Sequence, residues 1–146
     1  MTDKATDEHS TFESEIAAFF SAYLSAFRRE DASAVSELWD EVGLFPTPKG
    51  NFSMDREAFR NHCVTLLNFY RNQGVAEPTG ELLSAVELFP DVAQARMAYS
   101  MLSSDGTPIA DWEHVYILRK ADGQWRVSLT IADDEMAAWG AAGAEL

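Results

Sequence analysis

The sequence has almost no cysteine and no long apolar run, and each absence excludes a class of protein. Cys63 is the only cysteine, so the chain has no internal disulfide and no cysteine-rich metal cluster. No stretch of about eighteen apolar residues is present, which argues against a membrane-spanning helix. Phosphate-binding glycine loops, dinucleotide fingerprints and serine-nucleophile elbows are also missing. We therefore expect a cytoplasmic protein without a metal or cofactor.

Positive charge is scarce as well. Eleven Lys and Arg residues stand against 24 Asp and Glu residues, which gives a formal net charge of −13. Such a chain repels phosphate backbones and anionic lipid surfaces, so we expect neither nucleic acid nor a membrane as partner.

The length fits one domain. A chain of 146 residues buries roughly 70% of the surface that its unfolded form exposes. Residues 1–9 are polar and acidic, which predicts a disordered tail. We expect a single domain over residues 10–140 and a short tail over residues 141–146, because no linker or internal repeat divides the chain.

The first half of the chain has helical periodicity. Ser10 and Glu13 have the spacing of a capping box and predict the start of a helix. The apolar residues that follow recur at three- and four-residue steps and predict a single, strongly aromatic face: Phe12, Ile16, Phe19, Phe20, Tyr23, Leu24 and Phe27. A short helix after Asp31 and a helix over residues 54–72, capped by Ser53, are also predicted.

From Val75 onward the apolar pattern alternates as in β-strands. Asp105-Gly106 and Asp122-Gly123 are turn sequences between alternating runs, so residues 109–131 predict a central hairpin. Helices followed by a meander of strands indicate an α+β fold, in which a curved antiparallel sheet wraps around the long first helix and two further helices.

The two turns set a register for the sheet, and a slip of one residue would invert its faces. One predicted face is almost wholly apolar: Ala93, Ala95, Met97, Tyr99, Met101, Trp112, His114, Tyr116, Leu118, Trp125, Val127, Leu129 and Ile131. The other face is more polar and includes Asp111, Glu113 and Arg126. We expect the apolar face to lie under the aromatic helix.

The chain resembles the nuclear transport factor two-like superfamily, which contains ketosteroid isomerases, polyketide cyclases and kinase association domains. The resemblance covers about residues 12–131 and is carried by five stretches: Tyr23–Phe27, Asp31–Val35 with Leu38-Trp39, Pro46–Gly50, His114–Tyr116 and Asp122–Trp125. It implies a cone-shaped, cystatin-like α+β barrel with a conical pocket between the first helix and the sheet. It also implies a homodimer formed through the sheet.

The ketosteroid isomerases provide a catalytic comparison. Proton transfer next to a carbonyl group needs a general base and donors that hold the oxyanion. By resemblance, Tyr23 corresponds to the oxyanion tyrosine and Glu113 to its acidic partner. Thr47 occupies the position of the base, and a threonine hydroxyl does not accept a proton near neutral pH. Glu113 reaches the pocket only if the polar face of the sheet is the concave one, which is the alternative register.

The apolar register instead directs His114 into the pocket, where a neutral imidazole can contact a ligand or act as a base. Tyr23 and His114 are the polar candidates in this register, although each can also be a packed core residue. The remaining predicted pocket residues are mostly aromatic: Phe27, Trp39, Phe45, Thr47, Phe59, Tyr99, Trp112 and Tyr116.

Two functions remain open. The first is binding of a hydrophobic small molecule in a mostly apolar pocket, including an isomerase or cyclase that acts on a hydrophobic carbonyl compound. The second is a non-catalytic, dimeric association module whose pocket is filled by its own side chains. A cavity of at least about 300 Å³ with polar atoms directed into it would favour the first.

Overall fold

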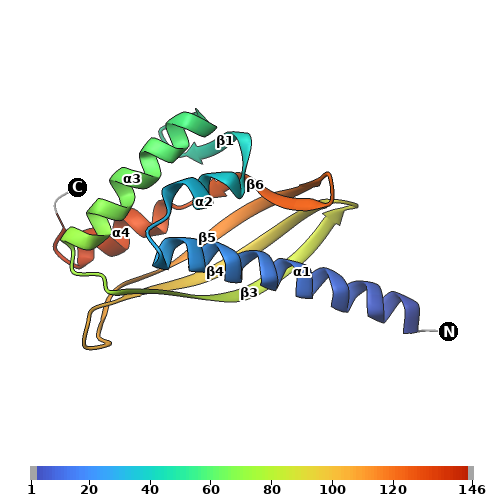
Figure 1. The fold of residues 1–146 in the computed structure, drawn as a ribbon, viewed down its shortest axis with the longest axis horizontal. Helices are drawn as coiled ribbons and strands as arrows, with labels where there is room; N and C mark the ends of the chain where they lie inside the picture. The colour runs from blue at the N-terminus through green and yellow to red at the C-terminus, as the bar shows by residue number, and fades with distance from the viewer. Residues whose placement is uncertain (1–2, 145–146) are drawn as a thin grey trace.

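The computed structural model describes residues 3–144, and the side chains of residues 11–132 and 134–144. Within residues 3–144 the chain forms four helices and one six-stranded sheet (Figure 1). In chain order the elements are α1 (Asp3–Arg28), α2 (Ala32–Glu37), β1 (Trp39–Thr47), β2 (Gly50–Asp55), α3 (Arg56–Asn72), β3 (Glu77–Phe89), β4 (Val92–Leu102), β5 (Pro108–Ala121), β6 (Gln124–Ile131) and α4 (Asp133–Ala141).

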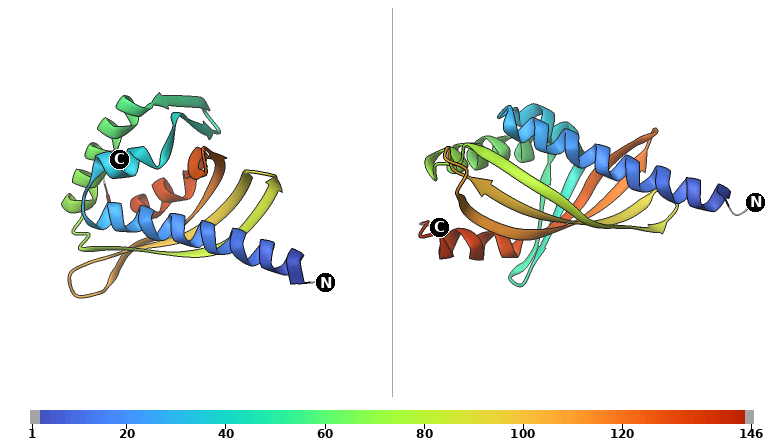
Figure 2. Two further views of the ribbon diagram at one scale, coloured as in Figure 1. Left: turned by 45° about the vertical axis from the view of Figure 1, so that its right-hand side comes forward. Right: turned by 90° about the horizontal axis from the view of Figure 1, so that it is seen from below.

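The sheet has the strand order β2-β1-β6-β5-β4-β3. Neighbouring strands are antiparallel except β1 and β6, which run parallel. The sheet curves but does not close, and α1 lies along its concave side (Figures 1 and 2). The predicted α+β class is confirmed.

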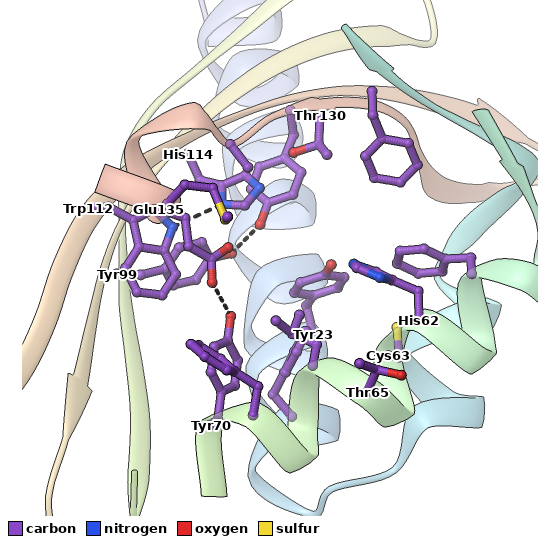
Figure 3. Close-up of a pocket in the computed structure, with 18 of the residues that line it drawn as sticks. Tyr23, His62, Cys63, Thr65, Tyr70, Tyr99, Trp112, His114, Thr130 and Glu135 are labelled. Carbon is purple, nitrogen blue, oxygen red and sulfur yellow. Dashed lines mark hydrogen bonds between the residues drawn. The ribbon is translucent and has the colours of Figure 1, made fainter. Parts of the chain in front are cut away.

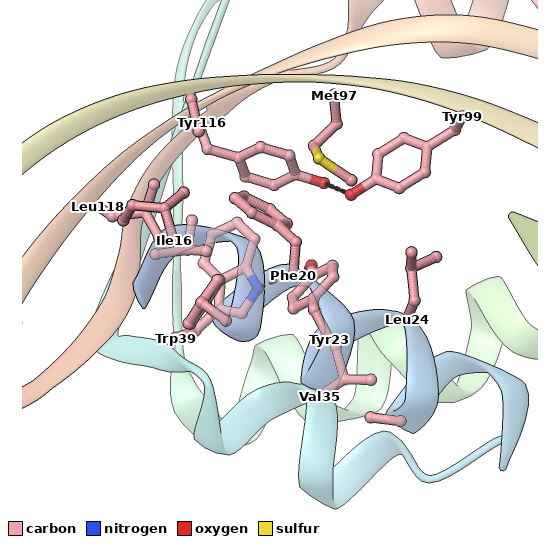
Figure 4. Packing of buried hydrophobic residues seen from close by; sticks show 14 of the residues in the cluster. Ile16, Phe20, Tyr23, Leu24, Val35, Trp39, Met97, Tyr99, Tyr116 and Leu118 are labelled. Atoms are coloured by element: carbon pink, nitrogen blue, oxygen red, sulfur yellow. Dashed lines mark hydrogen bonds between the residues drawn. The ribbon is translucent and has the colours of Figure 1, made fainter. Parts of the chain in front are cut away.

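The aromatic face of α1 forms the centre of the core, as its periodicity predicts. Ile16 and Phe20 are 0% and 2% exposed, and Phe20 packs against Tyr116 of β5 with ring centroids 5.0 Å apart (Figure 4). Full burial of each such side chain contributes on the order of 1.5 to 3 kcal/mol. The concave side chains of β4 and β5 are therefore fixed by the helix that covers them.

The first helix starts earlier than its capping pattern predicts. α1 begins at Asp3, so Ser10 lies inside the helix and the predicted tail is helical from residue 3 onward. Residues 1 and 2 lie outside the described part of the chain.

The region between α2 and α3 contains a strand that was not predicted and a helix cap that differs from the predicted one. Gly50 and Asn51 belong to strand β2, which pairs with β1 although Pro46 lies in the ladder opposite Asn51. The third helix is capped by Asp55 rather than by Ser53, because the Asp55 side chain accepts a hydrogen bond from the backbone of Ala58. The sequence of β2 lacks the regular apolar alternation that would have indicated a strand.

The sheet register follows the apolar prediction except in β6. Ile117 pairs with Leu129, whereas the next residue, Leu118, pairs with Val127, so Ser128 is an extra residue in β6. This β-bulge reverses the orientation of the side chains that follow it. Thr130 is consequently buried, at 4% exposed, and the predicted inward positions of Leu129 and Ile131 are wrong.

Gly43 of β1 leaves room for the ring of Trp39. A Cβ atom at Gly43 would lie 2.6 and 2.7 Å from two carbons of that ring, which is buried and cannot move freely. We expect Gly43→Ala to lower the free energy of unfolding by about 1 to 3 kcal/mol, the usual cost of overpacking. Urea unfolding measures the change. The exposed neighbour provides the control: Val42→Ala should cost less than about 1 kcal/mol, and equal losses would contradict the steric explanation.

Candidate functional site

A cavity of about 620 Å³ lies between the C-terminal half of α1, the helices α3 and α4, and the concave side of the sheet (Figure 3). The N-terminal half of the aromatic face of α1 packs as solid core, whereas Tyr23, Leu24 and Phe27 line the cavity. The change from core to cavity thus occurs within one helix.

Ten of the eleven residues predicted for the pocket or the catalytic site line this cavity. They are Tyr23, Phe27, Trp39, Phe45, Thr47, Phe59, Tyr99, Trp112, His114 and Tyr116. Most are aromatic, so an apolar surface dominates the cavity wall. Their role in binding or catalysis stays a prediction.

Glu113 is the residue that lies elsewhere. It is on the opposite face of β5, half-exposed, and forms an ion pair with Arg96 of β4. The alternative register, which would direct Glu113 into the pocket, is therefore wrong. Side chains alternate along a strand, and the larger apolar set lies against α1.

Tyr23 of α1 is held by Trp39 of β1. The indole Nε1 of Trp39 donates a hydrogen bond of 3.1 Å to the Tyr23 hydroxyl oxygen. Burial raises the pKa of Tyr23 well above its usual value, so the phenol keeps its proton. Because Trp39 occupies the oxygen as a donor, the hydroxyl proton of Tyr23 remains available to an acceptor in the cavity.

His114 of β5 has a defined orientation. Its Nδ1 accepts a hydrogen bond of 3.1 Å from Nε1 of Trp112, which places the proton of the neutral ring on Nε2. The ring stacks on Tyr116, with centroids 4.6 Å apart and planes 10° apart. Burial lowers the pKa of His114 to about 3. At neutral pH His114 is thus a hydrogen-bond donor rather than a charged group or an effective base.

Tyr99 and Tyr116 form a hydroxyl pair between neighbouring strands. Their oxygen atoms are 2.7 Å apart, and both residues are buried (Figure 4). One hydroxyl donates to the other, so the pair keeps a second proton for another acceptor.

Glu135 of α4 is the only residue of the described cavity lining that carries a carboxyl group. Its Oε2 accepts hydrogen bonds from the Tyr70 hydroxyl at 2.5 Å and from Nε1 of Trp139 at 3.1 Å (Figure 3). Burial raises the pKa of Glu135, and these two hydrogen bonds oppose part of the rise. The described lining contains no Lys or Arg that could pair with the carboxylate.

Sequence reasoning did not identify Glu135 as a pocket residue, because Asp133-Asp134-Glu135 has the composition of a solvated helix start. One feature of the sequence could have indicated that Glu135 faces inward. Glu135 and Trp139 are four residues apart and therefore lie on the same face of a helix, so the burial of Trp139 places Glu135 on the buried face as well.

Thr47 lines the cavity with its hydroxyl already engaged. It donates to the carbonyl oxygen of Gly50 at 3.0 Å and accepts from the amide of Lys49 at 3.1 Å. Cys63 is also in the wall, and burial raises the pKa of its thiol to about 12, so it stays protonated. Among the side chains of residues 11–132 and 134–144, no group of three or more potential ligands is arranged to hold a metal ion.

The curved sheet, the long helix on its concave side and the cavity between them define a nuclear transport factor two-like (NTF2-like) protein. Residues 13–135 match a model of the family described as NTF2-like protein (DUF6841), and the chain belongs to this family. No curated protein matches the sequence. No helix among the described residues is both long and apolar enough to cross a membrane.

Solved structures show the same fold. Aln2 from a Streptomyces species matches with a TM-score of 0.69 at 12% identity, over 90% of this chain and 96% of Aln2. A ketosteroid isomerase-like protein from Erwinia carotovora atroseptica matches with a TM-score of 0.62 at 23% identity, over 81% and 92%. A domain of unknown function with a cystatin-like fold from Nostoc punctiforme has a TM-score of 0.66 at 18% identity, over 82% and 74%.

The low pKa of His114 makes stability depend on pH. The unfolded chain, with a histidine pKa near 6.5, binds more protons than the folded chain between about pH 6.5 and pH 3, so stability falls as pH falls through this range. We expect the wild type to lose about 2 kcal/mol more between pH 7 and pH 5 than His114→Gln, measured by urea unfolding at each pH. The variant serves as the control because every other titrating group is shared. Parallel losses in the two proteins would contradict the burial of a neutral imidazole.

Proposed function

We propose that this protein binds a hydrophobic small molecule in the cavity. The observation that carries the proposal is the cavity itself, whose volume of about 620 Å³ lies within the range of ligand pockets, about 300 to 1,000 Å³. An apolar wall with a few directed polar groups is typical of such pockets. The protein is expected to act in the cytoplasm, where its single buried cysteine remains a thiol.

The polar groups of the wall suit an oxygen-containing ligand. The hydroxyl of Tyr23 and Nε2–H of His114 are donors, so together they favour an acceptor such as a carbonyl oxygen. An isomerase or cyclase acting on a hydrophobic carbonyl compound is the enzymatic form of the proposal. It is supported less well than binding, because the proton acceptor that such chemistry needs is not at the expected position: Thr47 is a poor acceptor, and the carboxyl group of Glu135 lies on α4 instead.

The alternative function, a dimeric association module with a filled pocket, is less consistent with a cavity of this volume. Dimer formation is compatible with ligand binding, however, and we propose a homodimer through the outer face of the sheet. Leu44, Leu129 and Ile117 are directly opposite one another on β1, β6 and β5 and form an apolar row on that face. Leu44 is 44% exposed, so a partner could bury substantial apolar surface there.

Ligand binding is tested by blocking the cavity. Leu66 of α3 lines the cavity, so Leu66→Trp would place a larger ring inside it. We expect a cyclic ketone such as 2-adamantanone to change the tryptophan fluorescence of the wild type, because Trp39, Trp112 and Trp139 line the cavity. In Leu66→Trp the affinity should fall by about tenfold or more, since part of the buried apolar contact is lost.

Val64→Trp is the matched control, because Val64 lies on the same helix but is 48% exposed. This variant should bind the ketone as the wild type does. Binding that is equally strong in Leu66→Trp would place the ligand outside the cavity, and the absence of binding to the wild type by ketones of several sizes would contradict the proposed function.

The dimer is tested by light scattering at micromolar concentration. Leu44→Glu would place a charge in the apolar row, so it should shift the protein from dimer to monomer. Leu83→Glu introduces the same charge at an equally exposed leucine on the edge strand β3 and should leave the dimer intact. A monomeric wild type, or a dimer unaffected by Leu44→Glu, would contradict this interface.

A further inference from the structure

Glu135 presents an unpaired carboxyl oxygen to the cavity. Both of its hydrogen bonds end on Oε2, and no bond to Oε1 is formed by the described residues. The only fully enclosed side-chain polar atom without a partner in the described part of the chain is Nε of Arg56. Oε1 of Glu135 is therefore accessible, at a residue that lines the cavity.

The charge on this carboxylate is not balanced from within the cavity wall. The described lining includes no Lys or Arg, and burial lowers the pKa of both of its histidines, His62 and His114, so that neither is charged near neutral pH. Removing an unpaired carboxylate from water costs several kcal/mol, which a nearby cation offsets. The same absence of basic side chains makes the cavity unfavourable for a ligand that carries a carboxylate or phosphate.

Aromatic side chains lie beside the carboxylate, since Tyr70 and Trp139 both donate hydrogen bonds to it. The Tyr70 and Trp139 rings are stacked, with centroids 5.5 Å apart, and Trp112 lies against Trp139 with centroids 6.1 Å apart. All three residues line the cavity. Tyrosine and tryptophan faces attract an organic ammonium group through the ring quadrupole. The anion and the rings beside it thus favour the same kind of ligand group.

Two further features favour a negative charge at this position and a positive charge in the ligand. Glu135 lies in the first turn of α4, where the helix dipole stabilises a carboxylate. The formal net charge of −13 also attracts cations to the protein and repels anions.

We propose that Glu135 and the rings of Tyr70, Trp112 and Trp139 form a binding site for a protonated amine, and that the ligand of the cavity is a hydrophobic amine. The apolar body of the ligand occupies the space between α1 and the sheet, and its ammonium group donates a hydrogen bond to Oε1 of Glu135. This inference rests on the proposed function and specifies its ligand class.

Three probes that share one hydrocarbon body test the assignment: 1-adamantanemethylamine, 1-adamantanemethanol and 1-adamantanecarboxylate. Their dissociation constants at pH 7 are measured by calorimetry and tryptophan fluorescence. We expect the amine to bind at least about tenfold more tightly than the alcohol, because it adds a charge-assisted hydrogen bond, and the carboxylate to bind most weakly.

Glu135→Gln removes the charge but keeps an oxygen that accepts from Tyr70 and Trp139, so the wall of the cavity is preserved. We expect this variant to bind the amine and the alcohol with similar affinity, while the affinity for the alcohol stays within about twofold of the wild type. Asp134→Asn is the matched control, since it removes the same charge from an exposed neighbouring position. It should retain the preference for the amine.

Each outcome distinguishes the inference from the function on which it rests. If the alcohol binds as tightly as the amine in the wild type, or if the preference survives in Glu135→Gln, the ammonium site is overturned while ligand binding stands. If none of the three probes binds and ketones also fail to bind, the proposed function fails and this inference fails with it. The wild-type comparison needs no variant, so misfolding of Glu135→Gln does not prevent the test.

Discussion

The structure depends on the burial of one aromatic helix face against a curved sheet. The N-terminal half of the apolar face of α1 is buried against the sheet, with Ile16 0% and Phe20 2% exposed. The C-terminal half continues the same face from Tyr23 to Phe27, but there it lines a cavity bounded by α3 and α4. One periodic pattern therefore specifies both the core and the cavity wall.

Three polar groups of the cavity accept hydrogen bonds from indole donors. Trp39 donates to Tyr23, Trp112 to His114 and Trp139 to Glu135. Each bond satisfies one acceptor and orients the side chain, because an indole can only donate. The arrangement leaves donor protons on Tyr23 and His114 and an acceptor oxygen on Glu135. These groups are the basis for a ligand that has an apolar body and a polar end.

Sequence patterns predicted most of the helices and strands, and they predicted which face of the sheet lines the cavity. The strict alternation of β4 and β5 identified the face that carries Tyr99, Trp112, His114 and Tyr116, since alternation is a local property. The bulge at Ser128 was not predictable, because it results from the pairing of β6 with β5. Glu135 was missed for a similar reason: its burial depends on Tyr70 and Trp139, and Tyr70 is distant in sequence.

The proposed ligand of the cavity is a hydrophobic amine whose ammonium group binds Glu135. A crystal structure of the protein with 1-adamantanemethylamine tests it most directly. We expect the hydrocarbon between α1 and the sheet, with its nitrogen about 3 Å from Oε1 of Glu135. A probe bound outside the cavity, or one inside it with the nitrogen directed away from Glu135, would contradict the proposed ammonium site.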